Sequence, residues 1–305
     1  MGREVTMLQS PVDRHIVVDG VRLAYCDHGH GEPVVFVHGT PSHTVIWREV
    51  LPQVSRAGYR VVGYDLLGYG YSERPMRRDT SVTAQAALLE QLLTSLGIGE
   101  VTLVGHDIGG AVAQILATQN PDRVRRLLLI DTVSYNSWPS PTWRAIIDEQ
   151  LDDHATMSAT AFEAMLTEQL EMTVVDRRRM SQAVREAYLD VHRSPLGRIS
   201  FFEHQVRHYD SIHTQRLTAL LGRLTMPVRL LWGAEDAWQS VSYAHRLAAA
   251  IPGSTEPAVV AGAGHFLPEE APDVVVEQVL DLLAVAAGTT AGATGHGCEG
   301  AGVEP

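Results

Sequence analysis

The chain has 305 residues, of which 45 % are hydrophobic and 20 % charged, as is typical of a globular protein with a sizeable core. Its formal net charge of −12 argues against a nucleic-acid partner, because binding phosphates requires clustered Lys and Arg. No apolar run approaches the roughly 20 residues that cross a membrane, and the N-terminal segment lacks the apolar centre of a signal peptide. We therefore expect a cytoplasmic protein that does not insert into membranes.

The first predicted element is a β-hairpin in residues 15–29, where two β-rich runs flank Asp19-Gly20. Short runs rich in Val and Leu follow it, namely PVVFVHG, YRVVGYD, VTLVGHD, VRRLLLID, VRLLWG and PAVVAG. Because these runs show no polar alternation, they are typical of strands buried on both faces of a parallel sheet. Helical patterns such as TAQAALLEQLLTSLG, which Gly97 closes as a C-cap, alternate with them. The alternation predicts an α/β fold with a mostly parallel central sheet flanked by helices.

The alternation stops between about Ser137 and Leu221, where helix formers, His and Arg replace the buried runs. We expect this segment to form a helical cap over the carboxyl ends of the strands, where ligands bind in such sheets. The final segment is dominated by Gly, Ala and Thr and cannot bury enough apolar surface to become ordered. The predicted organisation is an N-terminal extension at 1–13, a core at 14–136 and 222–287, a cap at 137–221 and a disordered tail at 288–305.

Three short motifs place a candidate nucleophile, acid and histidine in that order along the chain. Asp107 is central in GHDIG, between a predicted strand and a helix, where a Gly-x-nucleophile-x-Gly turn lifts the side chain above the sheet. Asp236 follows a buried strand in WGAEDAW, and His265 follows the last strand in GAGHF. This order is that of the α/β-hydrolase triad. Asp131, at the end of another strand, is the alternative position for the acid.

These motifs, together with HGTPS at 38–42 and YDLLGYGYSERP at 64–75, resemble one branch of the α/β-hydrolase family. That branch contains epoxide hydrolases and haloalkane dehalogenases. The resemblance covers roughly residues 14–287 and is weakest in the cap. It implies the α/β-hydrolase fold, with Asp107 as nucleophile, His265 as general base and Asp236 as the acid that orients it. The backbone N–H groups of Thr40 and Ile108 are expected to form the oxyanion hole.

An aspartate nucleophile changes the chemistry expected of such a site. Attack on an acyl carbonyl would form an anhydride, whereas attack on an sp³ carbon gives an ordinary alkyl ester of Asp107. Asp107 is ionised at neutral pH and needs no base to activate it. His265 is then free to deprotonate the water that hydrolyses the ester. The sequence therefore predicts a hydrolase that works through an alkyl-enzyme ester.

The leaving group stays open at this point. An epoxide opens to an alkoxide that must be protonated. A departing halide instead needs N–H donors, and Trp138 or Trp143 could supply an indole N–H. Epoxide hydrolysis to a vicinal diol is the leading hypothesis, and haloalkane dehalogenation is the alternative. An ester or lactone hydrolase and a non-catalytic ligand-binding protein of the same fold also stay open. The candidate leaving-group donors are Tyr209 and His204 first, then Tyr188, Tyr243 and Trp138.

The sequence implies no metal or organic cofactor. Cys26 and Cys298 form neither a disulfide framework nor a metal-ligand spacing, and GYGYS at Gly68 lacks the Lys of a phosphate-binding loop. The expected partner is a small, mainly hydrophobic substrate, with no nucleic acid and no membrane. A homodimer stays open.

Overall fold

The computed structural model describes residues 8–286; the predicted tail at 288–305 and most of the predicted N-terminal extension lie outside the described residues. An eight-stranded sheet forms the centre, in the order β1-β2-β4-β3-β5-β6-β7-β8. The β1–β2 and β2–β4 pairs are antiparallel and the other five are parallel, which confirms the prediction of a mostly parallel sheet. The strands are β1 Arg14–Val18, β2 Val21–His28, β3 Pro33–Val37, β4 Arg60–Tyr64, β5 Val101–His106, β6 Val124–Ile130, β7 Val228–Gly233 and β8 Ala258–Val260.

Local sequence explains the strands and their first turn. Asp19 and Gly20 both have positive φ, 48° and 75°, which is the conformation of a two-residue turn whose twist suits an antiparallel hairpin. The six predicted Val- and Leu-rich runs form β3 to β8. All six residues of β5 are buried, as expected of a central strand covered on both faces.

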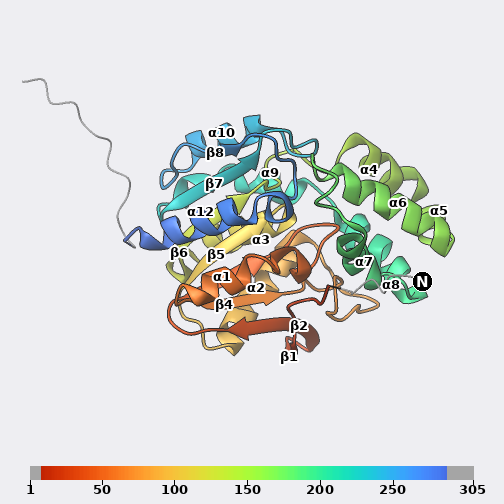
Figure 1. The fold of residues 1–305 in the computed structure, drawn as a ribbon, viewed down its shortest axis with the longest axis horizontal. Helices are drawn as coiled ribbons and strands as arrows, with labels where there is room; N and C mark the ends of the chain where they lie inside the picture. Colours follow the sequence, from red (N-terminus) through yellow and green to blue (C-terminus); the bar gives the residue numbers. More distant parts are fainter. Residues whose placement is uncertain (1–7, 287–305) are drawn as a thin grey trace, which may run out of the picture.

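Helices cover the sheet on both faces (Figure 1). α1 contacts α12, and α2 contacts α3. Gly97 follows α2 with a φ of 67°, the left-handed conformation predicted for its C-cap. Among residues 8–286 no helix reaches the length and hydropathy of a membrane-spanning segment. The flanking helices are α1 Leu51–Arg56, α2 Val82–Ser95, α3 Ile108–Gln119, α10 Val241–Ala250, α11 Leu267–Glu270 and α12 Pro272–Ala284.

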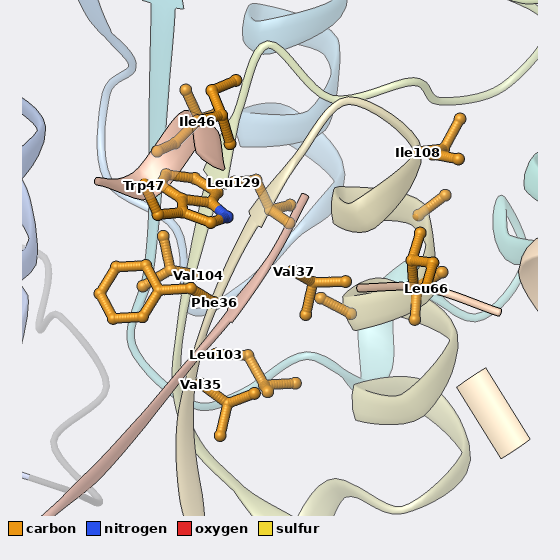
Figure 2. Packing of buried hydrophobic residues seen from close by; sticks show 14 of the residues in the cluster. Val35, Phe36, Val37, Ile46, Trp47, Leu66, Leu103, Val104, Ile108 and Leu129 are labelled. Atoms are coloured by element: carbon orange, nitrogen blue, oxygen red, sulfur yellow. The ribbon is translucent and has the colours of Figure 1, made fainter. Parts of the chain in front are cut away.

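The alternation of side chains along β3 and β5 builds the core on both sides of the sheet. Figure 2 shows Phe36 and Val104 on the face that Trp47 covers, and their neighbours Val37 and Leu103 on the opposite face. The rings of Phe36 and Trp47 pack with their centroids 5.4 Å apart. This packing holds the carboxyl ends of the central strands in place, and the loops that follow those ends carry the candidate site.

The chain between β6 and β7, residues 131–227, is described throughout and contains helices but no strand. Figure 1 shows α4 to α8 gathered beyond one end of the sheet. A π-helical turn, Phe201–Gln205, continues α8, and such turns are frequent at functional sites. The helices of this segment are α4 Pro141–Ala145, α5 Leu151–Ala155, α6 Ala159–Met172, α7 Gln182–Asp190, α8 Pro195–Ser200 and α9 Ile212–Leu217.

Candidate active site

Asp107 occupies a sharp turn between the end of β5 and the start of α3. Its backbone has φ 53° and ψ −122°, a strained conformation for a residue with a side chain, of the kind found at functional sites. The turn also requires close backbone approach at Gly109, where a Cβ atom would lie 2.3 Å from the Val37 carbonyl oxygen. A glycine there lets the start of α3 pack directly on β3 and raises Asp107 above the carboxyl edge of the sheet.

The two carboxylate oxygens of Asp107 have different neighbours. Oδ1 accepts a hydrogen bond of 2.8 Å from the backbone N–H of Thr40, in the loop after β3. Oδ2 faces His265, whose Nε2 lies 3.5 Å away. Gly39 permits this approach, because a Cβ atom there would come within 2.4 Å of the Asp107 Cβ. One oxygen is therefore anchored to the backbone, while the other points toward the imidazole.

His265 is held from its other side by Asp236. The Nδ1 of His265 lies 2.8 Å from Oδ2 of Asp236, in the loop after β7. The Oδ1 of Asp236 accepts backbone N–H bonds from Trp238 and Gln239, at 2.7 and 2.9 Å. The Asp236 carboxylate is thus fixed by its own loop, and it fixes the imidazole in turn.

Burial and neighbouring charges have opposite effects on the pKa values of Asp107 and His265. Burial disfavours the charge of Asp107, but His265 and the Thr40 N–H outweigh it and bring the pKa of the carboxyl below its usual value. Burial likewise disfavours a charged His265, but Asp236 and then Asp107 overcome it and raise the pKa of the imidazole well above its usual value. Both shifts favour an ionised Asp107 beside a protonated His265.

A second buried carboxyl, that of Asp131, adjoins Asp236. Its Oδ1 accepts a 2.8 Å bond from the Gly233 N–H, and its Oδ2 finds no donor among residues 8–286. Burial, followed by the charge of Asp236, raises the pKa of Asp131 well above its usual range. This shift favours the neutral acid at Asp131, and the carboxylate that contacts the imidazole is that of Asp236.

A cavity of about 70 Å³ opens onto Asp107 and His265. Its wall combines the loops after β3, β5 and β7 with side chains from the segment between β6 and β7. A larger groove of about 1020 Å³ shares Tyr209 with it, but Asp107, Asp236 and His265 lie outside that groove, so the smaller cavity is the candidate site. The cavity is lined by Thr40, Pro41, Asp107, Trp143, Gln169, Thr173, Phe201, Tyr209, Trp238, Gln239 and His265.

Tyr209 is the predicted donor that reaches this cavity. Its hydroxyl shares a hydrogen bond with the Thr40 Oγ1, next to the backbone N–H that holds Asp107. Tyr69 is buried nearby, and Thr40 and Tyr209 are among the groups that influence the pKa of its hydroxyl. Burial raises the pKa of both tyrosines, so each hydroxyl stays protonated at neutral pH. Sequence reasoning missed Tyr69, although it lies in the GYGYS turn, and treated that turn as structural only.

The structure does not bring the other four predicted donors to the cavity. Tyr188 donates to Glu269 Oε1 at 2.5 Å, and the indole N–H of Trp138 donates to Thr214 Oγ1 at 2.8 Å. His204 uses both ring nitrogens, with Pro75 O at 2.5 Å and Ser200 Oγ at 2.9 Å. Tyr243 stacks on Tyr135, with ring centroids 6.2 Å apart. Their polar groups or rings are therefore committed to partners elsewhere in the fold.

Several cavity residues carried no functional signal in the sequence. Trp238 and Gln239 lie two and three residues after Asp236, and that proximity to a candidate acid is the one clue available. Gln169 belongs to α6, where a glutamine is an ordinary helix former with nothing to distinguish it. The backbone N–H of Ile108, at the first residue of α3, stays a prediction as the second oxyanion donor.

Comparison with known proteins adds findings on the family, on similar proteins and on a similar structure. Residues 32–272 match a family described as alpha/beta hydrolase fold. A soluble epoxide hydrolase from Corynebacterium sp. is 28 % identical over 93 % of this chain and 99 % of its own, and haloalkane dehalogenase 2 from Mycobacterium bovis is 27 % identical over 85 % and 91 %. A crystal structure of an alpha/beta hydrolase fold protein from Burkholderia ambifaria is 29 % identical, with a TM-score of 0.83, over 90 % of this chain and 98 % of its own.

Proposed function

This chain belongs to the alpha/beta hydrolase fold family, and from that premise we propose that it hydrolyses small epoxides to vicinal diols through an ester on Asp107. The observation that carries the proposal is the carboxylate itself, held by the Thr40 N–H at one oxygen and facing His265 at the other. In this proposal residues 137–221 act as a cap, because they supply Tyr209 and other parts of the cavity wall.

In the first step, Oδ2 of Asp107 attacks an epoxide carbon, and the ring C–O bond breaks. The low pKa of Asp107 supports this role, because the carboxylate is ionised without a base. The departing oxygen becomes an alkoxide and takes a proton from Tyr209, whose hydroxyl lies at the cavity beside Thr40. The product of this step is a hydroxyalkyl ester of Asp107.

In the second step, water hydrolyses that ester. Esterification removes the negative charge of Asp107, which is one of the groups that raise the pKa of His265, so the imidazole loses its proton more readily. That proton replaces the one that Tyr209 gave to the alkoxide. Neutral His265 then accepts a proton from water, whose oxygen bonds to the Asp107 Cγ while the Thr40 N–H stabilises the oxyanion. The bond between Cγ and Oδ2 breaks, and the departing oxygen takes the second proton of that water. The diol leaves, and the ion pair of Asp107 and His265 is restored.

Haloalkane dehalogenation is the second candidate, and the indoles of Trp143 and Trp238 on the cavity wall favour it. A halide would need their N–H groups. The epoxide reading is preferred because Tyr209 offers a hydroxyl beside Asp107, which an alkoxide needs and a halide does not. An ester or lactone hydrolase fits less well, since a carboxylate nucleophile would form an anhydride. A purely ligand-binding protein would not need an acid hydrogen-bonded to a histidine that in turn faces a carboxylate nucleophile.

Two measurements test the proposal. The protein is incubated with a panel of small epoxides and a panel of haloalkanes, and diol and free halide are assayed separately; diol without halide is expected. A single turnover in heavy-oxygen water should then place the label in the carboxyl group of Asp107, detected by peptide mass spectrometry. Label that enters the diol alone would mean that water attacks the substrate directly, and would overturn the ester mechanism.

A further inference from the structure

Two glutamine side chains from different elements of the fold line the catalytic cavity. Gln239 lies in the loop after β7, and Gln169 lies on α6. Gln239 is 4 % exposed, and its Oε1 finds no donor in the described part of the chain. Over the same residues, 8–286, the structure gives no hydrogen bond to the side-chain amide of Gln169. Both amides are therefore free to bind a ligand.

The main chain of Gln239 is held firmly. Its N–H donates to Asp236 Oδ1 at 2.9 Å, and its carbonyl accepts the indole N–H of Trp232 at 2.8 Å. The side chain is buried as well, so it has little rotamer freedom left to lose when it binds. Buried polar atoms almost always have a hydrogen-bond partner, so an orphaned acceptor on the wall of a reactive cavity indicates that the ligand supplies it.

The cavity also restricts the charge of the group that binds there. Its charged residues are Asp107 and His265, which pair with each other, and every arginine of the described chain lies outside the lining. The sequence has no lysine. A substrate carboxylate would therefore lack a cation to pair with. An amide both donates and accepts hydrogen bonds, and its simplest uncharged complement is a hydroxyl group.

We propose that Gln239 and Gln169 form a polar subsite for a hydroxyl group on the substrate, so that the preferred substrates are small epoxy alcohols. This inference rests on the proposed attack of Asp107 on an epoxide and names the substrate class of that same site. The hydroxyl donates to the Oε1 of Gln239 and accepts from a glutamine N–H. The volume of about 70 Å³ restricts the substrate to a short chain.

The test compares two epoxides of equal chain length, an epoxybutane and an epoxybutanol with its hydroxyl at the far end. The wild type should prefer the epoxybutanol in kcat/KM by about tenfold or more, because a site that hydrogen-bonds a hydroxyl rejects the analogue without it. Gln239→Leu and Gln169→Leu should each lower that preference. Gln205→Leu is the matched control: Gln205 is also buried with an orphaned Oε1, but it lies outside the cavity lining. It should leave the preference unchanged.

A binding measurement separates this inference from the proposed function. Thermal shift is measured with butanetriol and with butanediol, neither of which can alkylate the protein. The wild type should be stabilised more by the triol, and Gln239→Leu should lose that difference. Diol formation from both epoxides at equal kcat/KM, or equal stabilisation by the two alcohols, would overturn the subsite alone. A preference for the triol without any turnover of epoxides would support the subsite and overturn the proposed function.

Discussion

Replacing Asp236 with asparagine tests how the two steps of the proposed mechanism divide between Asp107, His265 and Asp236. Asp236 Oδ2 lies 2.8 Å from His265 Nδ1, and both side chains are buried. At an effective dielectric constant of about 20, unit charges at this separation attract by about 6 kcal/mol. Since each 1.36 kcal/mol is a factor of ten, complete loss of this charge slows ester hydrolysis by up to about 10⁴-fold. Alkylation of Asp107 needs no base and should continue.

Asp131 limits how far ester hydrolysis slows in the Asp236→Asn variant. Its pKa is raised by burial and by the charge of Asp236, so removing that charge lets Asp131 ionise close to His265. We therefore expect Asp236→Asn alone to slow hydrolysis by about 10²-fold to 10³-fold, and the double variant with Asp131→Asn to approach the full 10⁴-fold.

The assay follows both steps in one experiment. Rapid quenching and intact-mass measurement should show an adduct of one substrate mass accumulating in Asp236→Asn, with a slow rise of diol. Asp122→Asn, on the exposed turn after α3, is the control and should show wild-type rates without an adduct. The reasoning is refuted if turnover falls while the protein stays unmodified, because Asp236 would then be needed for alkylation. It is also refuted if the single and double variants are equally slow.

Three further predictions address the turn, the donor and the buried acid. Gly39→Ala should cost about 1–3 kcal/mol of stability and most of the activity, since its Cβ would meet the nucleophile at 2.4 Å, whereas Gly99→Ala, with open space around it, should change neither Tm nor kcat/KM. Tyr209→Phe should reduce kcat for epoxides by about 10²-fold or more, and Tyr243→Phe should not; equal rates for the two would remove Tyr209 as the donor. Asp131 has a folded pKa above its unfolded value of about 3.9, so it favours folding at low pH and loses that contribution as pH rises above about 4. Urea unfolding should show wild-type stability falling relative to Asp131→Asn as pH rises, and parallel curves would contradict a protonated Asp131.

The strands were predictable because their signal is local. Each run from β3 to β8 is rich in Val and Leu and shows no regular polar alternation, which is typical of strands covered on both faces. The β1–β2 turn depends on Asp19 and Gly20, whose conformational preferences act within two residues. The meeting of Asp107, Asp236 and His265 could also be expected from the sequence, because each follows a predicted strand and parallel strands place their carboxyl ends at one edge of the sheet.

The donors in the segment between β6 and β7 were not predictable in the same way. His204 and Tyr209 lie five residues apart and are the two leading donor candidates in the sequence, yet the structure brings Tyr209 to Thr40 and pairs His204 with Pro75. Trp138 binds Thr214, a residue 76 positions away. Such pairings depend on how short helices pack. The local sequence does not show which polar residue on a helix faces a cavity.

By itself, the sequence determined the α/β-hydrolase fold and the chain order in which Asp107, Asp236 and His265 follow their strands, since both depend on hydrophobic runs and turn residues within short windows. Only the tertiary structure decided that Asp236 rather than Asp131 pairs with His265, that Tyr209 reaches the cavity, and that Gln169 and Gln239 share its wall. The reason is physical: a side chain's partner is fixed by packing among segments far apart in the chain. Asp236 and Asp131 are both buried, but packing gives Asp236 the imidazole and two backbone N–H groups as partners.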